Sequence, residues 1–189
     1  MLDILLQLNW VDIIIVILVF RVCYISIKGG FIIEIFKLCG TICAIYLSLH
    51  YYMVLGARLQ GKSYVSVVPA NYFDFFCFFA LALLGYFIFF LLRSALYRFM
   101  ELKAIPALSK WGGFITGLFR SVFLTSLIIF AFSISTINYF EESGNKSYIG
   151  SRLSKVAPLT YSWIWNNLTS KFIPQEKFNN NVLEPDKKI

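Results

Sequence analysis

The sequence contains little charge and almost no histidine. Only 14% of its 189 residues are charged, and His50 is the single histidine. One histidine cannot form a histidine-rich metal site, and neither G-x-S-x-G nor H-E-x-x-H occurs. The four cysteines form no C-x-x-C pair, so a zinc knuckle or redox motif of that type is excluded. We therefore expect no catalytic residue, metal site or cofactor, and predict that the chain is not an enzyme.

Runs of lysine and arginine are also missing. The formal net charge is +7, but no basic cluster or alternation of basic and aromatic residues accompanies it. We therefore expect no nucleic-acid partner. In a membrane protein such an excess collects on loops that face the cytoplasm or anionic head groups.

Apolar residues take the place of the missing charge. They make up 59% of the chain, and the mean hydropathy is +0.72. A helix needs about 20 mostly apolar residues to cross the hydrocarbon core. Four segments meet this length, at residues 9–27, 31–55, 71–92 and 112–137. The sequence thus predicts an all-α membrane protein, a bundle of four transmembrane helices over residues 1–137 with the lipid bilayer as its main partner.

The loops between these segments predict an orientation. The first and third loops carry Lys28 and the basic residues Arg93, Arg98, Lys103 and Lys110. The second loop carries only Arg58 and Lys62. The positive-inside rule then places the first and third loops in the cytoplasm. Both termini are expected on the extracytoplasmic side, although basic residues also follow the last span.

The segment after the spans has a different composition. Residues 138–174 are more polar, and an aromatic and aliphatic set recurs there at helical spacing: Tyr161, Ile164, Trp165, Leu168 and Phe172. This pattern predicts an extracytoplasmic, amphipathic helical tail that lies flat at the membrane interface. A helix packed on the ends of the spans fits it equally well. Residues 175–189 are polar and are expected to be disordered.

Several charged residues lie inside the apolar segments. Asp12, Glu34, Lys37 and Asp74 are near segment ends, where they could extend to the head groups, while Arg21 and Arg120 lie deeper. Intramembrane charges are costly and usually face the bundle, where they pair with one another. We propose that Glu34 pairs with Arg120, with Arg21 as a competing or additional partner. The alternative is that each charge extends to the head groups separately.

Two stripes of small and polar residues accompany these charges. In the second segment the stripe is Gly30, Glu34, Lys37, Thr41, Ala44 and Ser48, and in the fourth it is Gly113, Gly117, Ser121 and Thr125. Small residues four apart let helices approach closely in lipid. Both stripes should face protein, and the second could join two copies of the chain. The candidate structural or functional residues are Asp12, Arg21, Gly30, Glu34, Lys37, Gly113, Gly117 and Arg120.

One catalytic pattern does occur, between Gly56 and Ser63. These residues fit G-x-x-x-x-G-K-[ST], the phosphate-binding loop of nucleotide hydrolases. That loop needs a β-strand before it and a helix after it. Here an apolar span precedes it and Pro69 follows soon after. We interpret the match as a coincidence.

The order of three motifs resembles a known family. Asn9-Trp10-Val11-Asp12 opens the first span, Lys28-Gly29-Gly30 leads to Glu34 in the second, and Gly112 to Arg120 reads G-G-F-I-T-G-L-F-R in the fourth. This set, followed by the aromatic tail, resembles the colicin V production protein family of CvpA-like bacterial membrane proteins. The resemblance covers residues 9–174.

The resemblance implies a bacterial inner-membrane protein linked to colicin V production or export and to envelope upkeep. Without catalytic motifs, we expect a non-enzymatic scaffold or accessory factor that acts through an unidentified membrane or envelope protein, or through self-association. The alternative is a subunit of an oligomeric small channel or transporter, with a pore lined by the two stripes. Four spans without an internal repeat argue against a complete secondary transporter.

Overall fold

The computed structural model describes residues 9–60, 70–99, 106–135, 138–173 and 176–183. Within these ranges it is built of helices and contains no strand. The long helices are α2 (Trp10–Gly29), α3 (Phe31–Gln60), α4 (Ala70–Phe99) and α5 (Pro106–Ile134). The shorter elements are α6 (Asn138–Lys146), α7 (Tyr148–Leu153), α8 (Val156–Ile164), the π-helical η1 (Trp165–Thr169), α9 (Ser170–Phe172) and the 3-10 turn η2 (Asn180–Val182). The predicted all-α fold with four membrane-length helices is confirmed.

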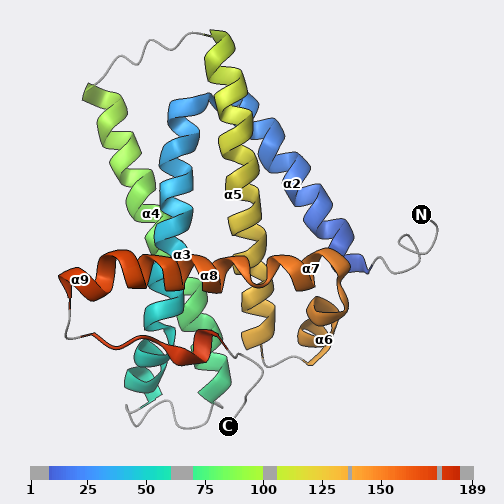
Figure 1. Ribbon diagram of the computed structural model, residues 1–189, viewed down its shortest axis with the longest axis vertical. Helices are drawn as coiled ribbons and strands as arrows, with labels where there is room; N and C mark the ends of the chain where they lie inside the picture. Colours follow the sequence, from blue (N-terminus) through green and yellow to red (C-terminus); the bar gives the residue numbers. More distant parts are fainter. Residues whose placement is uncertain (1–8, 61–69, 100–105, 136–137, 174–175, 184–189) are drawn as a thin grey trace.

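The four long helices run up and down in one bundle (Figure 1). They extend beyond most of the predicted segments because hydropathy marks only their apolar parts. α3 has 30 residues, or about 45 Å at 1.5 Å per residue, which exceeds the hydrocarbon thickness. α5 begins at Pro106 rather than at residue 112, since proline is favoured in the first turn of a helix.

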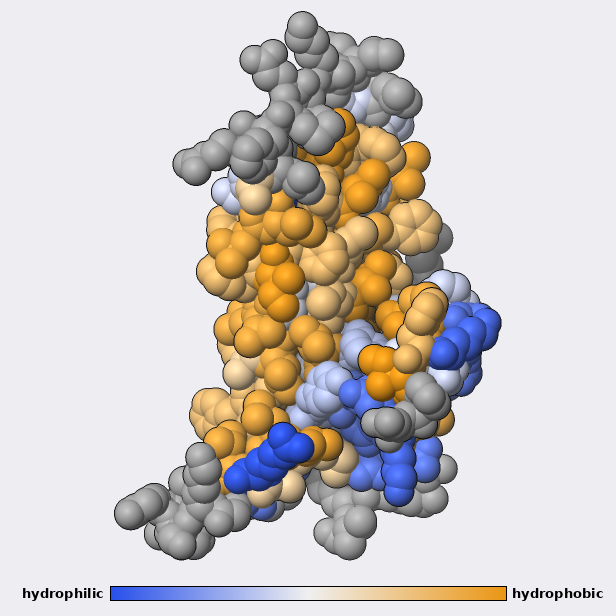
Figure 2. Space-filling view, turned by 90° about the vertical axis from the view of Figure 1, so that its left-hand side faces the viewer, coloured by the Kyte–Doolittle hydropathy of each residue, from blue (hydrophilic) through white to orange (hydrophobic). Residues whose placement is uncertain are grey.

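Large apolar side chains cover the outside of the bundle. Ile17, Phe20, Phe87 and Phe119 are each more than half exposed. Figure 2 shows apolar residues over most of one face of the spans, with hydrophilic residues gathered toward the end where the tail lies. A water-soluble protein rarely exposes so large an apolar surface, so lipid is the solvent that fits these helices.

The tail crosses the bundle as a rod. Figure 1 shows α7, α8 and α9 nearly end to end across α3 and α5, close to the start of α2. One face of the rod is buried, and its residues recur every four positions: Ala157, Tyr161, Trp165 and Thr169. Leu159, Trp163 and Phe172 are exposed on the rod. One side of the rod therefore packs on the spans, and apolar groups remain exposed on its outer side.

The predicted disorder after residue 175 is wrong for residues 176–183. Val182 is fully buried, and the Phe178 ring stacks on Tyr161 with ring centres 5.1 Å apart. The Asn179 amide donates a hydrogen bond of 2.8 Å to the carbonyl of Leu49 in α3. The apolar side chains of Phe178 and Val182 and the hydrogen bond from the Asn179 amide hold a segment whose overall composition is polar.

Candidate functional site

The most concentrated set of buried polar groups surrounds Glu34. This residue lies in the first turn of α3 and is completely buried. Its Oε2 accepts a hydrogen bond from Ser26 Oγ at 2.9 Å and lies 2.9 Å from Arg120 Nη1. Its Oε1 pairs with Lys37 Nζ one turn further along α3. The carboxylate therefore joins α2, α3 and α5, and we call these four residues the Glu34 cluster.

The turn between α2 and α3 makes room for this carboxylate. Gly30 has φ = 81°, a value that residues with a side chain rarely adopt, and it reverses the chain direction within one residue. A Cβ on Gly29 would lie only 3.2 Å from Glu34 Oε1. The two glycines thus allow a tight hairpin in which Ser26 faces Glu34.

The cluster has more positive than negative charge. It contains one carboxylate and two cations, and Arg120 is only 5% exposed. Arg120 Nε is buried without a hydrogen-bond partner in the described part of the chain. Arg120 also lines a groove between α4 and α5.

The structure contains the Glu34–Arg120 pair that the sequence suggested, but Arg21 does not join it. Arg21 is exposed on α2 and makes no ion pair with any described residue. Lys37 joins the cluster through its ion pair with Glu34. Both stripes face protein, since Glu34, Thr41, Ser48, Ser121 and Thr125 are all buried.

The glycine stripe of α5 is used within the chain. A Cβ on Gly113 would lie 2.6 Å from the Ser26 carbonyl oxygen, and one on Gly117 would collide with the Ser26 side chain. The face formed by Gly113, Gly117, Ser121 and Thr125 is thus covered by α2. A second copy could use this face only by displacing α2, and self-association remains a prediction.

Asp12 forms a second buried site at the other end of α2. Its position near a span end would have let this residue extend to the head groups, but it is completely buried. Its carboxylate accepts hydrogen bonds from the backbone N–H groups of Asn9 and Ile149, each 2.9 Å long, and from Ser147 Oγ at 2.6 Å. It therefore satisfies N–H groups at the starts of both α2 and α7, where helix dipoles favour negative charge. This contact fixes the tail to the first span.

His50 belongs to a third site, which we did not predict from the sequence. It is 7% exposed and stacks on Tyr46 and Trp165. Its Nδ1 lies 2.9 Å from the Tyr161 hydroxyl, and its Nε2 lies 3.1 Å from Glu176 Oε2. Only the aromatic residues of the tail hinted at this cluster, because Tyr161, Trp165 and Glu176 lie more than 100 positions after His50 in the sequence.

The Tyr161 hydroxyl connects the parts of this cluster. Burial raises the pKa of Tyr161 to about 12, so the hydroxyl stays protonated near neutral pH. That oxygen already accepts a hydrogen bond from the Asn179 N–H. The same hydroxyl lies 2.9 Å from His50 Nδ1, and His50 Nε2 lies 3.1 Å from Glu176 Oε2, so the cluster links α3 to two parts of the tail.

The phosphate-loop pattern does not have the required structure. Gly56 to Gln60 form the last turns of α3, whereas a phosphate loop follows a strand. Gly56 packs directly against the side chain of Asp74 in α4. Gly61, Lys62 and Ser63 lie outside the described residues. Among the described residues, no group of three His, Cys, Asp or Glu side chains is placed to hold a metal ion.

Comparison with known proteins gives one match. A family model described as Colicin V production protein matches residues 11–161. This region includes Asp12, the Glu34 cluster, His50 and Tyr161. No curated protein matches the chain, and no solved structure does.

Proposed function

Because the chain belongs to the colicin V production protein family, we propose that it is a non-enzymatic scaffold or accessory protein for colicin V production or export. It is a membrane protein with four helices long and apolar enough to span a bilayer. The resemblance stated above carries the link to export and envelope upkeep. The partner in this proposal is another membrane or envelope protein.

The observation that carries the proposal is the use of the buried charges. Glu34 joins three helices, and Asp12 joins the first span to the tail. Buried carboxylates that are paired in this way hold their helices in a fixed arrangement, because leaving either carboxylate unpaired in the interior would be costly. A rigid bundle that presents a tail at the membrane surface suits a binding role.

The proposed location is the inner membrane of a bacterium, with both termini outside the cytoplasm. The end of the bundle with the α2–α3 turn carries four basic residues, Lys28, Lys37, Arg93 and Lys110. Among the described residues near this end, the carboxylate that opposes them is Glu34. The positive-inside rule puts that end in the cytoplasm. The rod of α7 to α9 then lies on the extracytoplasmic face.

A channel or transporter subunit is the second candidate. The groove that Arg120 lines favours it, because a cationic side chain beside an apolar groove could contact a passing solute. A pore lined by the two stripes within one copy is less compatible with their close packing on Ser26. Such a pore would need several copies and another surface.

Complementation tests the proposal. A colicin V-producing host that lacks its own family member should regain secreted colicin V when this chain is expressed, measured by growth-inhibition zones. Arg21→Gln changes an exposed charge outside the Glu34 cluster and should complement equally well. Normal amounts of the protein in the membrane without any restored secretion would contradict the proposal. Ion flux in liposomes containing the purified chain, abolished by Arg120→Gln, would favour the channel instead.

A further inference from the structure

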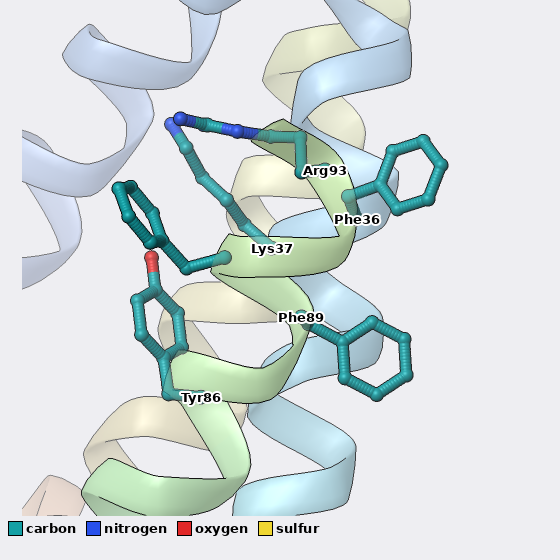
Figure 3. A pocket seen from close by; sticks show the side chains of 6 residues that line it. Phe36, Lys37, Tyr86, Phe89 and Arg93 are labelled. Atoms are coloured by element: carbon teal, nitrogen blue, oxygen red, sulfur yellow. The ribbon is translucent and has the colours of Figure 1, made fainter. Parts of the chain in front are cut away.

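Two cations from neighbouring helices face one another where α3 begins and α4 ends. Figure 3 shows the side chains of Lys37 and Arg93 extending until their ends face one another, over a small hollow that Tyr86 also lines. Arg93 lies against the Phe90 ring, with the guanidinium carbon 5.3 Å from its centre, and has no carboxylate partner among the described residues. Lys37 shares Glu34 with Arg120. Like charges repel, so an additional anion between Lys37 and Arg93 would stabilise this arrangement.

The depth of these cations matches that of lipid phosphates. Arg93 is two residues from the end of the apolar stretch Tyr72–Ala95. Lys37 Nζ lies 3.8 Å from where a Cβ on Gly29 would be, so the ammonium group reaches the level of the α2–α3 turn. Long basic side chains near the ends of spans reach the head-group layer in this way.

A larger apolar groove lies next to this hollow along α4. It has a volume of about 380 Å³ and lies between α4 and α5, with α3 as its floor. Tyr86 lines both the hollow and the groove. One face of α4 follows them along their whole length, through Arg93, Phe90, Tyr86, Ala82, Phe79 and Phe75. The hollow and the groove together therefore offer two cations near the membrane surface and an apolar face of α4 within the hydrocarbon.

We propose that this groove binds one anionic phospholipid. Its phosphate lies between Lys37 and Arg93, and one acyl chain runs past Tyr86 along α4. Arginine and lysine both bind phosphate through charge-assisted hydrogen bonds, and basic pockets between spans are known to select anionic head groups. The acyl chain covers Ala82 and Leu127, which would otherwise line an unfilled apolar space. This site does not depend on the proposed role in colicin V production.

Lipid retention tests the proposal. The purified full-length chain is extracted from vesicles with equal amounts of phosphatidylglycerol and phosphatidylcholine, and its bound lipids are measured by mass spectrometry. Phosphatidylglycerol should be enriched on the wild type. Arg93→Gln should reduce the enrichment about tenfold, the effect of losing one charged hydrogen bond. Lys110→Gln, which removes an exposed cation of α5 outside the groove, is the matched control and should keep the enrichment.

Two further arms separate the possible sources of the anion. Ala82→Trp fills the groove but keeps both cations, so it should reduce the retention of both lipids if an acyl chain lies there. An excess of inorganic phosphate during extraction should leave phosphatidylglycerol bound. Equal retention of the two lipids by the wild type, full enrichment in Arg93→Gln, unchanged lipid in Ala82→Trp, or complete displacement by phosphate would each overturn the proposal.

Discussion

At the scale of single residues, Glu34 shows how this chain carries charge inside a bilayer. Its two oxygens contact a hydroxyl and two cations from three helices. Burying a carboxylate is costly unless charged partners and hydrogen bonds replace the water it loses. Ser26, Lys37 and Arg120 supply these interactions. Arg120, one of the two cations, also lines the groove between α4 and α5.

Glu34→Gln should strongly destabilise the bundle. It leaves two cations without their carboxylate, and breaking one partner of a buried pair costs about 3–5 kcal/mol. The thermal unfolding midpoint in detergent and the amount of protein in the membrane should both fall. Arg21→Gln, on the exposed side of α2, should change neither.

The charge reversal of the same pair gives a second test. Glu34→Arg combined with Arg120→Glu restores opposite charges across α3 and α5, although Lys37 then repels the new arginine. The double variant should recover part of the stability lost in either single variant, in the same thermal measurement. Additive losses in the double variant would contradict direct pairing.

Asp12→Ala should loosen the tail more than it affects the spans. The change removes acceptors at the starts of α2 and α7, and each lost cap costs about 1 kcal/mol. Amide hydrogen exchange over residues 147–153 should become faster. Ser147→Ala, which removes the hydroxyl contact to Asp12 and the cap on the Gly150 N–H, should speed exchange in α7 but leave the start of α2 unchanged. Exchange rates equal to those of the wild type would argue against the double cap.

Some of these sites could be predicted from the sequence and others could not. The spacing of Glu34 and the glycine pattern before Arg120 placed both residues on protein-facing stripes, and opposite charges then suggested a pair. Asp12 has the spacing of a capping box with Asn9, but its contact with α7 depends on where the chain returns 135 residues later. His50 and Glu176 are likewise joined only by tertiary packing.

At the scale of elements, glycine controls how closely the helices pack. Gly113 and Gly117 bring α5 against Ser26 of α2, and Gly85 brings α4 within contact of the backbone at Ala44. In lipid, helix association depends on such close packing because the hydrophobic effect does not drive it. The small-residue pattern was visible in the sequence, but its partner helix was not.

Gly113→Ala should therefore separate α2 from α5. The new methyl group would meet the Ser26 carbonyl, part of the backbone, which cannot move aside easily. Overpacking of this kind costs about 1–3 kcal/mol, seen as a lower thermal midpoint. Gly144→Ala is the control, since its nearest neighbour would be at an ordinary 3.9 Å. Equal midpoints for the two variants would contradict the predicted close contact.

The docked segment 176–183 gives a test of the tail. Tyr161→Phe removes the hydroxyl that contacts Asn179 and His50, and the loss of the Asn179 bond weakens the docking of the segment by about 1 kcal/mol. Tryptic cleavage after the exposed Lys177 should become roughly fivefold faster, because the segment opens more often. Cleavage after Lys171, on the rod, should change little. Uniform acceleration at both sites would indicate general unfolding instead.

At the scale of the whole molecule, composition alone predicted the class of fold. Fewer charges and more apolar residues than in soluble proteins indicate lipid as solvent, and span length then sets the number of helices. Helix ends were less predictable, because α3 and α4 continue past their apolar parts. The ordered end of the tail was missed since its polar composition hides Phe178 and Val182, which anchor it to the spans.

Labelling of single cysteines tests the whole arrangement most directly. Cysteine is introduced at four exposed lysines. Lys28→Cys and Lys110→Cys lie at one end of the bundle, and Lys155→Cys and Lys177→Cys lie at the other. The four native cysteines lie within the spans. A membrane-impermeant maleimide should label the variants at 155 and 177 in intact spheroplasts. It should label those at 28 and 110 only after the membrane is opened. Labelling of all four positions in intact cells, or different sides for 155 and 177, would contradict a four-span bundle with its tail on one face.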